Sequence, residues 1–410
     1  MSIENTRAPS VEYFTPKQPL PSGTVLGKKN DKIPPLFSEL KIKGMTIPNR
    51  IGLSPMCMYS ADNGFPTPFH MIHYNTYSMR GTGLIILESV AVTSNGRISP
   101  NDLGIWTDEQ AYKLKEIVDF AHSQGKKIGI QLSHSGRKAS TLPLYTLKFD
   151  VSTDKNFKGD FSDDVWSSSD SFETDDKLFK NVKKLNINQV KEIILKFGEA
   201  AKRCYEICKF DFIEIHAAHG YLINQFLSQT TNKRGLGDEY SGLNFETRIK
   251  FLIDIVNTIK SNINTDEIPI FVRLSASENN DDNENAWTFN DTLKLIPILI
   301  KNGGIDVFDI SSGGNSPVKS GKQLSQLEMA KQVKCLIDDL RLTSSLGDKI
   351  YVAAVGNINN AKLANDLISE NNCDIVLVGR EFLKSPNLVE NWAHDLNTNI
   401  QMTLQYGWPL

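Results

Sequence analysis

The chain has 410 residues, of which 40% are hydrophobic and 23% charged, and its formal net charge is -3. This balance is typical of a globular protein and gives no reason to expect nucleic acid or an anionic membrane as a partner. No apolar run approaches the ~20 residues that a membrane span needs. The first residues lack the pattern of a secretory signal, and five scattered cysteines indicate reduced thiols. We therefore expect a cytoplasmic protein.

Residues 1–35 are rich in proline and glycine and have no sustained hydrophobic period, which predicts an extended N-terminal arm. From residue 36 to residue 400, strand-like and helix-like segments alternate. The strand-like segments are short and rich in branched aliphatic residues, as strands buried on both faces must be. They span 51–54, 84–88, 128–132, 210–216, 270–274, 307–310, 351–355 and 375–378.

Amphipathic helices are predicted between these strands. The clearest begins with Thr107 and Gln110 as a capping box and stops at Gly125. Others cover 190–204 and 249–256. Eight strands alternating with helices predict a closed (β/α)8 TIM barrel, with an open doubly wound sheet as the alternative.

Two segments depart from this alternation. Residues 141–185 are rich in Asp, Ser and Lys and enlarge the loop between the third and fourth strands. The carboxyl ends of barrel strands carry the active site, so this insertion is expected above the barrel mouth, either as a solvated loop or as a lid over the site. Residues 401–410 are predicted to form a C-terminal tail.

The fourth strand ends in an unusual concentration of polar groups, namely His216, His219 and Tyr221. Two imidazoles at a strand end can donate hydrogen bonds to one carbonyl or phenolate oxygen, and a nearby phenol can deliver a proton. We therefore interpret this segment as a catalytic site.

Other strand ends predict a phosphate-bearing cofactor. The sixth, seventh and eighth strands lead into Gly313, Gly356 and Gly379-Arg380, and barrels commonly bind phosphate near their last two strands. Gln131 and Arg273 suit the edge of a polar ring that can accumulate negative charge. No Gly-x-Gly-x-x-Gly fingerprint follows a strand, which disfavours a Rossmann site. Flavin mononucleotide (FMN) fits, and spacing alone leaves pyridoxal phosphate or a phosphorylated substrate open.

Several motifs resemble those of the old yellow enzyme family, the NADH:flavin oxidoreductases, in the family's order. They are SPMCMYS at 54–60, TPFH at 67–70, GIQL at 129–132, GRKA at 136–139, HAAHGYL at 216–222 and FVR at 271–273. The first motif, with its cysteine, is similar to that of the thermophilic-like class. The resemblance covers residues 36–392. It implies an FMN-binding (β/α)8 barrel that reduces activated alkenes, which are small molecules, with NADPH or NADH.

The resemblance also implies individual roles. His216 and His219 would bind the substrate's carbonyl oxygen, hydride would reach its β-carbon from flavin N5, and Tyr221 would protonate its α-carbon. Tyr59 would lie over the substrate, and Cys57 beside the flavin unless it is a packing cysteine. The expected cofactor-binding residues are Ser54, Pro55, Met56, Cys57, Ser89, Gln131, Arg273, Gly313, Gly356, Gly379 and Arg380.

Two other functions stay open on the sequence. One is a metal-dependent barrel lyase or hydrolase, with His216 and His219 as ligands and Glu88 as the third. The other is a flavin-binding protein without turnover. A homo-oligomer also stays open. In the thermophilic-like class an arginine near the C-terminus can reach a neighbouring subunit's site, whereas residues 405–410 contain none. We expect either no shared site or one lined by Tyr406 and Trp408.

Overall fold

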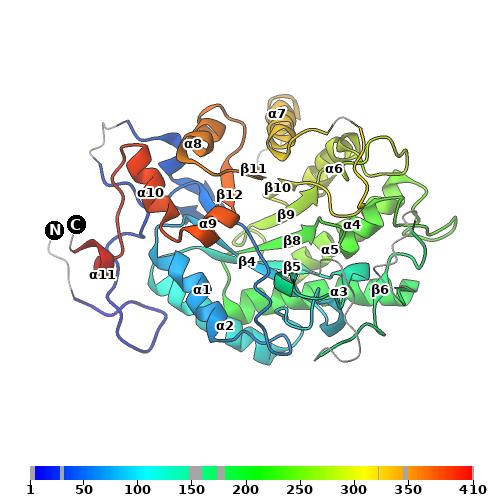
Figure 1. Ribbon diagram of the computed structural model, residues 1–410, viewed down its shortest axis with the longest axis horizontal. Coiled ribbons are helices and arrows are strands. Elements are labelled where there is room, and N and C mark those ends of the chain that lie inside the picture. The colour runs from blue at the N-terminus through cyan, green and yellow to red at the C-terminus, as the bar shows by residue number, and fades with distance from the viewer. Residues whose placement is uncertain are drawn as a thin grey trace.

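The core of the protein is a closed barrel of eight parallel strands, seen in the computed structural model (Figure 1). The structure describes residues 5–27, 32–146, 159–172, 181–321, 323–344 and 350–408. The strands, in chain order, are β3 (Ile51–Leu53), β4 (Leu84–Ala91), β5 (Ile128–Ser133), β8 (Phe212–Ala217), β9 (Ile270–Ser275), β10 (Val307–Ser311), β11 (Tyr351–Val355) and β12 (Ile375–Val378). β12 pairs with β3 and closes the ring, so the TIM barrel is confirmed and the open sheet is wrong.

Helices surround the barrel (Figure 1). The longer ones are α1 (Pro68–Met79), α2 (Asp108–Ser123), α3 (Ile187–Arg203), α5 (Phe245–Asn262), α6 (Phe289–Asn302), α7 (Gln326–Ser344) and α8 (Ala361–Ser369). The shorter ones are α4 (Leu222–Leu227), α9 (Arg380–Lys384), α10 (Leu388–Asp395) and α11 (Leu404–Gly407). The capping box predicted at Thr107 and Gln110 is present at the start of α2. No helix in the described ranges is long and apolar enough to cross a membrane.

The bottom of the barrel is closed by an antiparallel hairpin that was not predicted from the sequence. It consists of β1 (Leu40–Ile42) and β2 (Met45–Ile47). Its buried side chains pack against the first inward-facing layer of the barrel, which includes Phe212, Phe271 and Val307. Because side chains alternate along a strand, the residues two positions further on also point inward, closer to the mouth.

The described part of the N-terminal arm lies at one side of the molecule and pairs with the C-terminal segment (Figure 1). Gly23 N donates to Gln401 O and Leu26 N donates to Asn399 O, both over 2.8 Å. Buried Lys126 donates its ammonium protons to the carbonyl oxygens of Ser22 and Thr82, which ties the arm to the barrel. Of the predicted tail, residues 409–410 lie outside the described residues.

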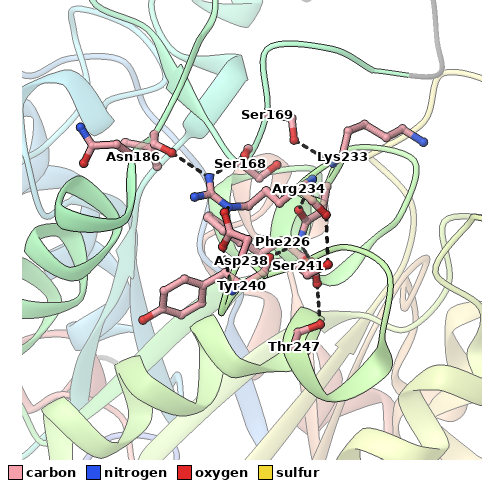
Figure 2. A network of polar contacts seen from close by, with 12 residues as sticks. Ser168, Ser169, Asn186, Phe226, Lys233, Arg234, Asp238, Tyr240, Ser241 and Thr247 are labelled. Atoms are coloured by element: carbon pink, nitrogen blue, oxygen red, sulfur yellow. Dashed lines mark hydrogen bonds and ion pairs between the residues drawn. The ribbon is translucent and has the colours of Figure 1, made fainter. Parts of the chain in front are cut away.

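The insertion between β5 and β8 is anchored where it returns to the barrel. β6 (Trp166–Ser167) pairs in parallel with β7 (Lys183–Lys184). Figure 2 shows the guanidinium group of Arg234, which donates to Ser168 O over 3.0 Å and to the carboxylate of Asp238 over 2.9 Å. The described parts of the insertion are thus attached to the loop between α4 and α5. Residues 147–158 and 173–180 of the predicted insertion lie outside the described residues.

Candidate active site

The groups at the end of β8 form a compact cluster. The ring centroid of His216 lies 5.1 Å from that of His219 and 4.8 Å from that of Tyr221, with the rings nearly perpendicular in both pairs. His219 has a φ of 59° and Gly220 a φ of 72°, so the chain turns through the left-handed region here. A Cβ atom on Gly220 would lie 2.2 Å from Gly314 O, so a glycine is required at this position. The sequence-predicted catalytic residues therefore lie together.

Both histidines are neutral hydrogen-bonding groups. Burial lowers the pKa of His216 well below its usual value, and burial lowers that of His219 to about 3, with the charge of Arg273 adding to both effects. His216 Nδ1 accepts from Ala218 N over 3.3 Å, which leaves the proton on Nε2. His219 Nε2 lies 2.7 Å from Ser311 Oγ. His216 can thus donate from Nε2, and His219 can donate from Nδ1 when Nε2 accepts from the serine.

The loop after β3 brings Cys57 and Tyr59 to the same region. Burial is the largest cause of the raised pKa of the Cys57 thiol, followed by the charges of Asp102 and Glu88, so the thiol stays protonated. Burial also raises the pKa of Tyr59, and the neighbouring Cys57 and Tyr221 raise it further. These groups interact electrostatically, so they lie near one another. Tyr59 has a φ of 49°.

Glu88 holds this loop in place and is not directed at the histidines of β8. Its carboxyl group accepts from Met58 N over 2.8 Å and from the hydroxyl of Tyr74 over 2.9 Å. Burial raises the pKa of Glu88 to about 8. Within the described ranges no three His, Cys, Asp or Glu side chains are grouped as metal ligands. The arrangement that the metal-dependent alternative needs, with Glu88 beside His216 and His219, is therefore not formed.

Gln131 and Arg273 lie inside the barrel, below the histidines. Arg273 Nε donates to Asp309 Oδ2 over 2.5 Å and its Nη2 donates to Ser54 Oγ over 3.0 Å. Gln131 Nε2 donates to Glu214 Oε2 over 2.6 Å. The residue paired with Gln131 on β4 is Ser89. The amide and the guanidinium group thus have fixed orientations in the middle of the barrel.

The ends of β11 and β12 enclose a cavity of about 400 Å³. Its lining includes Ser54, Met56, Gly356, Asn357, Gly379, Arg380 and Lys384. Gly356 has a φ of 122° and Gly379 caps the N-terminus of α9. The first amide groups of a helix have no acceptor within it, and they attract anions. Arg380 Nη2 donates to Asn357 Oδ1 over 2.8 Å. Glycine backbone and two cations make this cavity suitable for a phosphate group.

A second cavity, of about 480 Å³, shares Gly356 and Asn357 with the first and extends to Gly313. Gly313 N donates to Ser277 O over 2.7 Å, so this amide is already satisfied by the chain. A still larger cavity, of about 730 Å³, lies between Leu26 and the segment from α10 to α11, and its lining includes Trp408 but none of the predicted catalytic or cofactor-binding residues. The site is therefore located by its polar and titratable residues and not by the volume of a cavity.

Several polar residues of this region were not predicted from the sequence. Ser275 and Ser311 bind His219, and Gln326 Nε2 donates to Ser311 Oγ over 3.0 Å. Glu214 and Asp309 lie below the site. They were not singled out because they stand within largely apolar strand segments. The sequence did contain a signal for them, because each is a buried acidic residue within a predicted strand.

The fold and the site define a (β/α)8-barrel enzyme whose mouth fits a phosphate-bearing cofactor. Residues 35–399 match the model of the NADH:flavin oxidoreductase / NADH oxidase family. An NADH:flavin oxidoreductase of Gibberella zeae is 38% identical over 99% of this chain and 95% of its own. An NADPH dehydrogenase of Clostridium acetobutylicum is 38% identical over 90% of this chain and 98% of its own. Among solved structures, the old yellow enzyme of Trypanosoma cruzi has a TM-score of 0.66 at 23% identity, covering 90% of this chain and 94% of that one.

The chain belongs to the NADH:flavin oxidoreductase / NADH oxidase family, that of the old yellow enzymes. It is accordingly an oxidoreductase of a family that binds FMN and uses NADPH or NADH, and the resemblance noted in the sequence is confirmed.

Proposed function

We propose that this protein is an FMN-dependent ene-reductase, which reduces the carbon–carbon double bond of α,β-unsaturated carbonyl compounds. The observation that carries the proposal is the cluster at the end of β8. Two neutral imidazoles lie beside the phenol of Tyr221, in the mouth of a barrel that also has a phosphate-sized cavity. An oxygen that gains negative charge needs donors, and the carbon next to it needs a proton.

The residues in the mouth fit FMN. Gly356, Gly379 and Arg380 would hold its phosphate, since glycines allow the backbone to approach an anion and a guanidinium group can bind it in a fork. Gln131 and Arg273 would meet the pyrimidine edge of the ring. The residues that we propose to line the flavin ring are Ser54, Pro55, Met56, Cys57, Ser89 and Gly313. The chemistry that bound FMN supplies is hydride transfer between NAD(P)H and the β-carbon of the substrate.

The two histidines would bind the carbonyl oxygen of the substrate. His216 donates from Nε2, because its Nδ1 is occupied by Ala218 N. Donors preoriented in a buried site stabilise an oxygen that becomes negatively charged, and this withdraws electrons from the β-carbon. Because both imidazoles stay neutral, they stabilise the charge by hydrogen bonding and do not transfer a proton.

Tyr221 would complete the reduction by protonating the α-carbon. One hydride on the β-carbon and one proton on the α-carbon convert the alkene into the saturated carbonyl compound. General acid catalysis contributes about 10²–10⁴-fold, so loss of the phenol should be visible in the rate of this half-reaction.

The proposal is tested by the two half-reactions of the purified protein. Anaerobic NADPH or NADH should bleach the flavin absorbance, and 2-cyclohexenone should restore it and be converted to cyclohexanone. Tyr221→Phe should slow reoxidation by the enone and leave reduction near normal. Tyr112→Phe is the matched control, because Tyr112 is an exposed tyrosine of α2. A protein that is reduced but never reoxidised by enones would instead be a flavin-binding protein without this turnover. Equal slowing of both half-reactions would show that Tyr221 is structural.

A further inference from the structure

Four polar side chains form a buried layer in the middle of the barrel. Gln131, Glu214, Arg273 and Asp309 come from β5, β8, β9 and β10, and each is at most 4% exposed. The layer lies two residues above the apolar floor formed by Phe212, Phe271 and Val307. It lies two residues below His216 and Ser311, which face the site. Polar groups that are buried in this way must form hydrogen bonds with one another.

The hydrogen bonds from Gln131 and Arg273 leave one oxygen of each carboxyl group in this layer without a donor. Arg273 occupies Asp309 Oδ2, and Gln131 occupies Glu214 Oε2. Among the described residues, Glu214 Oε1 and Asp309 Oδ1 have no N–H or hydroxyl donor. The remaining hydrogen bond joins the two carboxyl groups to each other. Such a bond requires one proton, because two ionised carboxylates offer acceptors and no donor.

The net charge of the layer also favours one shared proton. Two ionised carboxylates and one guanidinium would leave a net negative charge buried, whereas one proton makes the layer neutral. Burial, and then the charge of Asp309, raise the pKa of Glu214 to about 8, while Arg273 and Gln131 oppose the shift. The pKa of Asp309 is raised as well, because burial outweighs the opposing contacts with Arg273 and Glu214.

No further charge of the described residues competes for the proton. The other titratable groups that interact with Arg273 are His216 and His219, and both are neutral. The residue paired with Asp309 on β11 is Ala353, and the residue paired with Ala353 on the next strand, β12, is Ile375, so both neighbours are uncharged. The proton is therefore held by the carboxyl group that contacts a neutral amide, and the ionised group is the one that contacts the cation.

We propose that Glu214 is protonated and donates to ionised Asp309, and that this carboxyl pair positions Gln131 and Arg273 and neutralises the cation that faces the cofactor. Glu214 and Asp309 are positioning residues, because they act through the amide and the guanidinium group. The part that concerns the cofactor rests on the proposed FMN site. The protonation of Glu214 does not.

Glu214→Gln is the decisive variant, because a glutamine has the shape and charge of a protonated glutamate. Its carbonyl can accept from Gln131 and its amide can donate to Asp309. The flavin reduction potential at pH 7 should therefore match that of the wild type. A higher potential in Glu214→Gln would overturn the proposal, because it would mean that the substitution removed a negative charge. The double variant Glu214→Gln/Asp309→Asn leaves Arg273 without a counter-ion and should raise the potential. An unchanged potential in the double variant would refute the placement of the pair beneath the flavin.

A second measurement does not depend on flavin. In the infrared spectrum of the protein as purified, the protonated-carboxyl absorption at pH 6 should contain a Glu214 component that is missing in Glu214→Gln, while the component of buried Glu88, whose pKa is also raised to about 8, stays in both proteins. In the wild type the Glu214 component should disappear on titration through about pH 8. Identical carboxyl bands in the two proteins would overturn the assignment of the proton. A protein that lacks flavin but shows this difference would contradict the proposed function and leave the carboxyl pair supported.

Discussion

Replacing His216 by alanine should weaken the binding of phenols, which mimic the negatively charged oxygen of the reaction. In the structure the free donor of this imidazole is Nε2–H, because Nδ1 accepts from Ala218 N. One charge-assisted hydrogen bond is worth about 1.5–3 kcal/mol. Since about 1.4 kcal/mol corresponds to a factor of ten, the Kd of a para-substituted phenol should rise roughly 10- to 150-fold.

The pH dependence sharpens this prediction. Burial lowers the pKa of His216 well below its usual value and that of His219 to about 3, so neither imidazole gains a proton between pH 5 and 8. Ionisation of the phenol itself affects variant and wild type alike. The ratio of the two Kd values should therefore be constant over this range.

The assay is a spectrophotometric titration of the oxidised protein with the phenol, at several pH values. His394→Ala serves as the control, because His394 is an exposed histidine of α10. An unchanged Kd in His216→Ala would refute the role of this donor. A ratio that grows below pH 6.5 would show instead that the wild-type site binds the phenolate with a charged imidazolium.

Three further predictions concern other parts of the molecule. Arg380→Ala should weaken FMN retention by about 1.5–3 kcal/mol, measured as flavin remaining after dialysis, and full retention would contradict the phosphate assignment. Burial lowers the pKa of Lys126 to about 7, so between pH 7 and 10 the unfolded chain keeps a proton that the native protein has released. The free energy of unfolding should rise with pH in this window, and urea titrations of Lys126→Met should lack that rise. Tyr145 of the insertion lies 6.2 Å from Tyr59, centroid to centroid, so Tyr145→Ala should raise the KM for bulky enones more than for 2-cyclohexenone, and equal effects would place the insertion outside the substrate site.

The barrel could be predicted from the sequence because its strands are buried on both faces. Runs such as 351–355 and 375–378 are short and apolar, and few structures besides a doubly covered parallel sheet produce that pattern repeatedly along a chain. The cluster at the end of β8 was also predictable, since His216, His219 and Tyr221 are close in sequence and must be close in space.

Contacts between distant strands could not be predicted in this way. The pairing of Glu214 with Asp309 depends on strand register and on which residue of each strand faces inward. The metal-dependent alternative needed Glu88 beside the two histidines, but a register shift between Leu87 and Ser89 in the pairing of β4 with β5 leaves Glu88 outside the regular ladder. An irregularity of this kind has no signal in the residues themselves.

The pairing of residues 23–26 with residues 399–401 has a consequence for how the protein is made. At roughly 5–20 residues per second, a ribosome needs about 20–75 s to travel from one partner to the other. For most of that time β12 has not been synthesised and cannot pair with β3. The nascent barrel is then an open sheet with two exposed edges. Such edges can pair with other chains, which makes this interval the period of greatest aggregation risk. Residues 23–26 are thus synthesised long before they can be ordered, and a truncation near residue 400 would leave them without their partners.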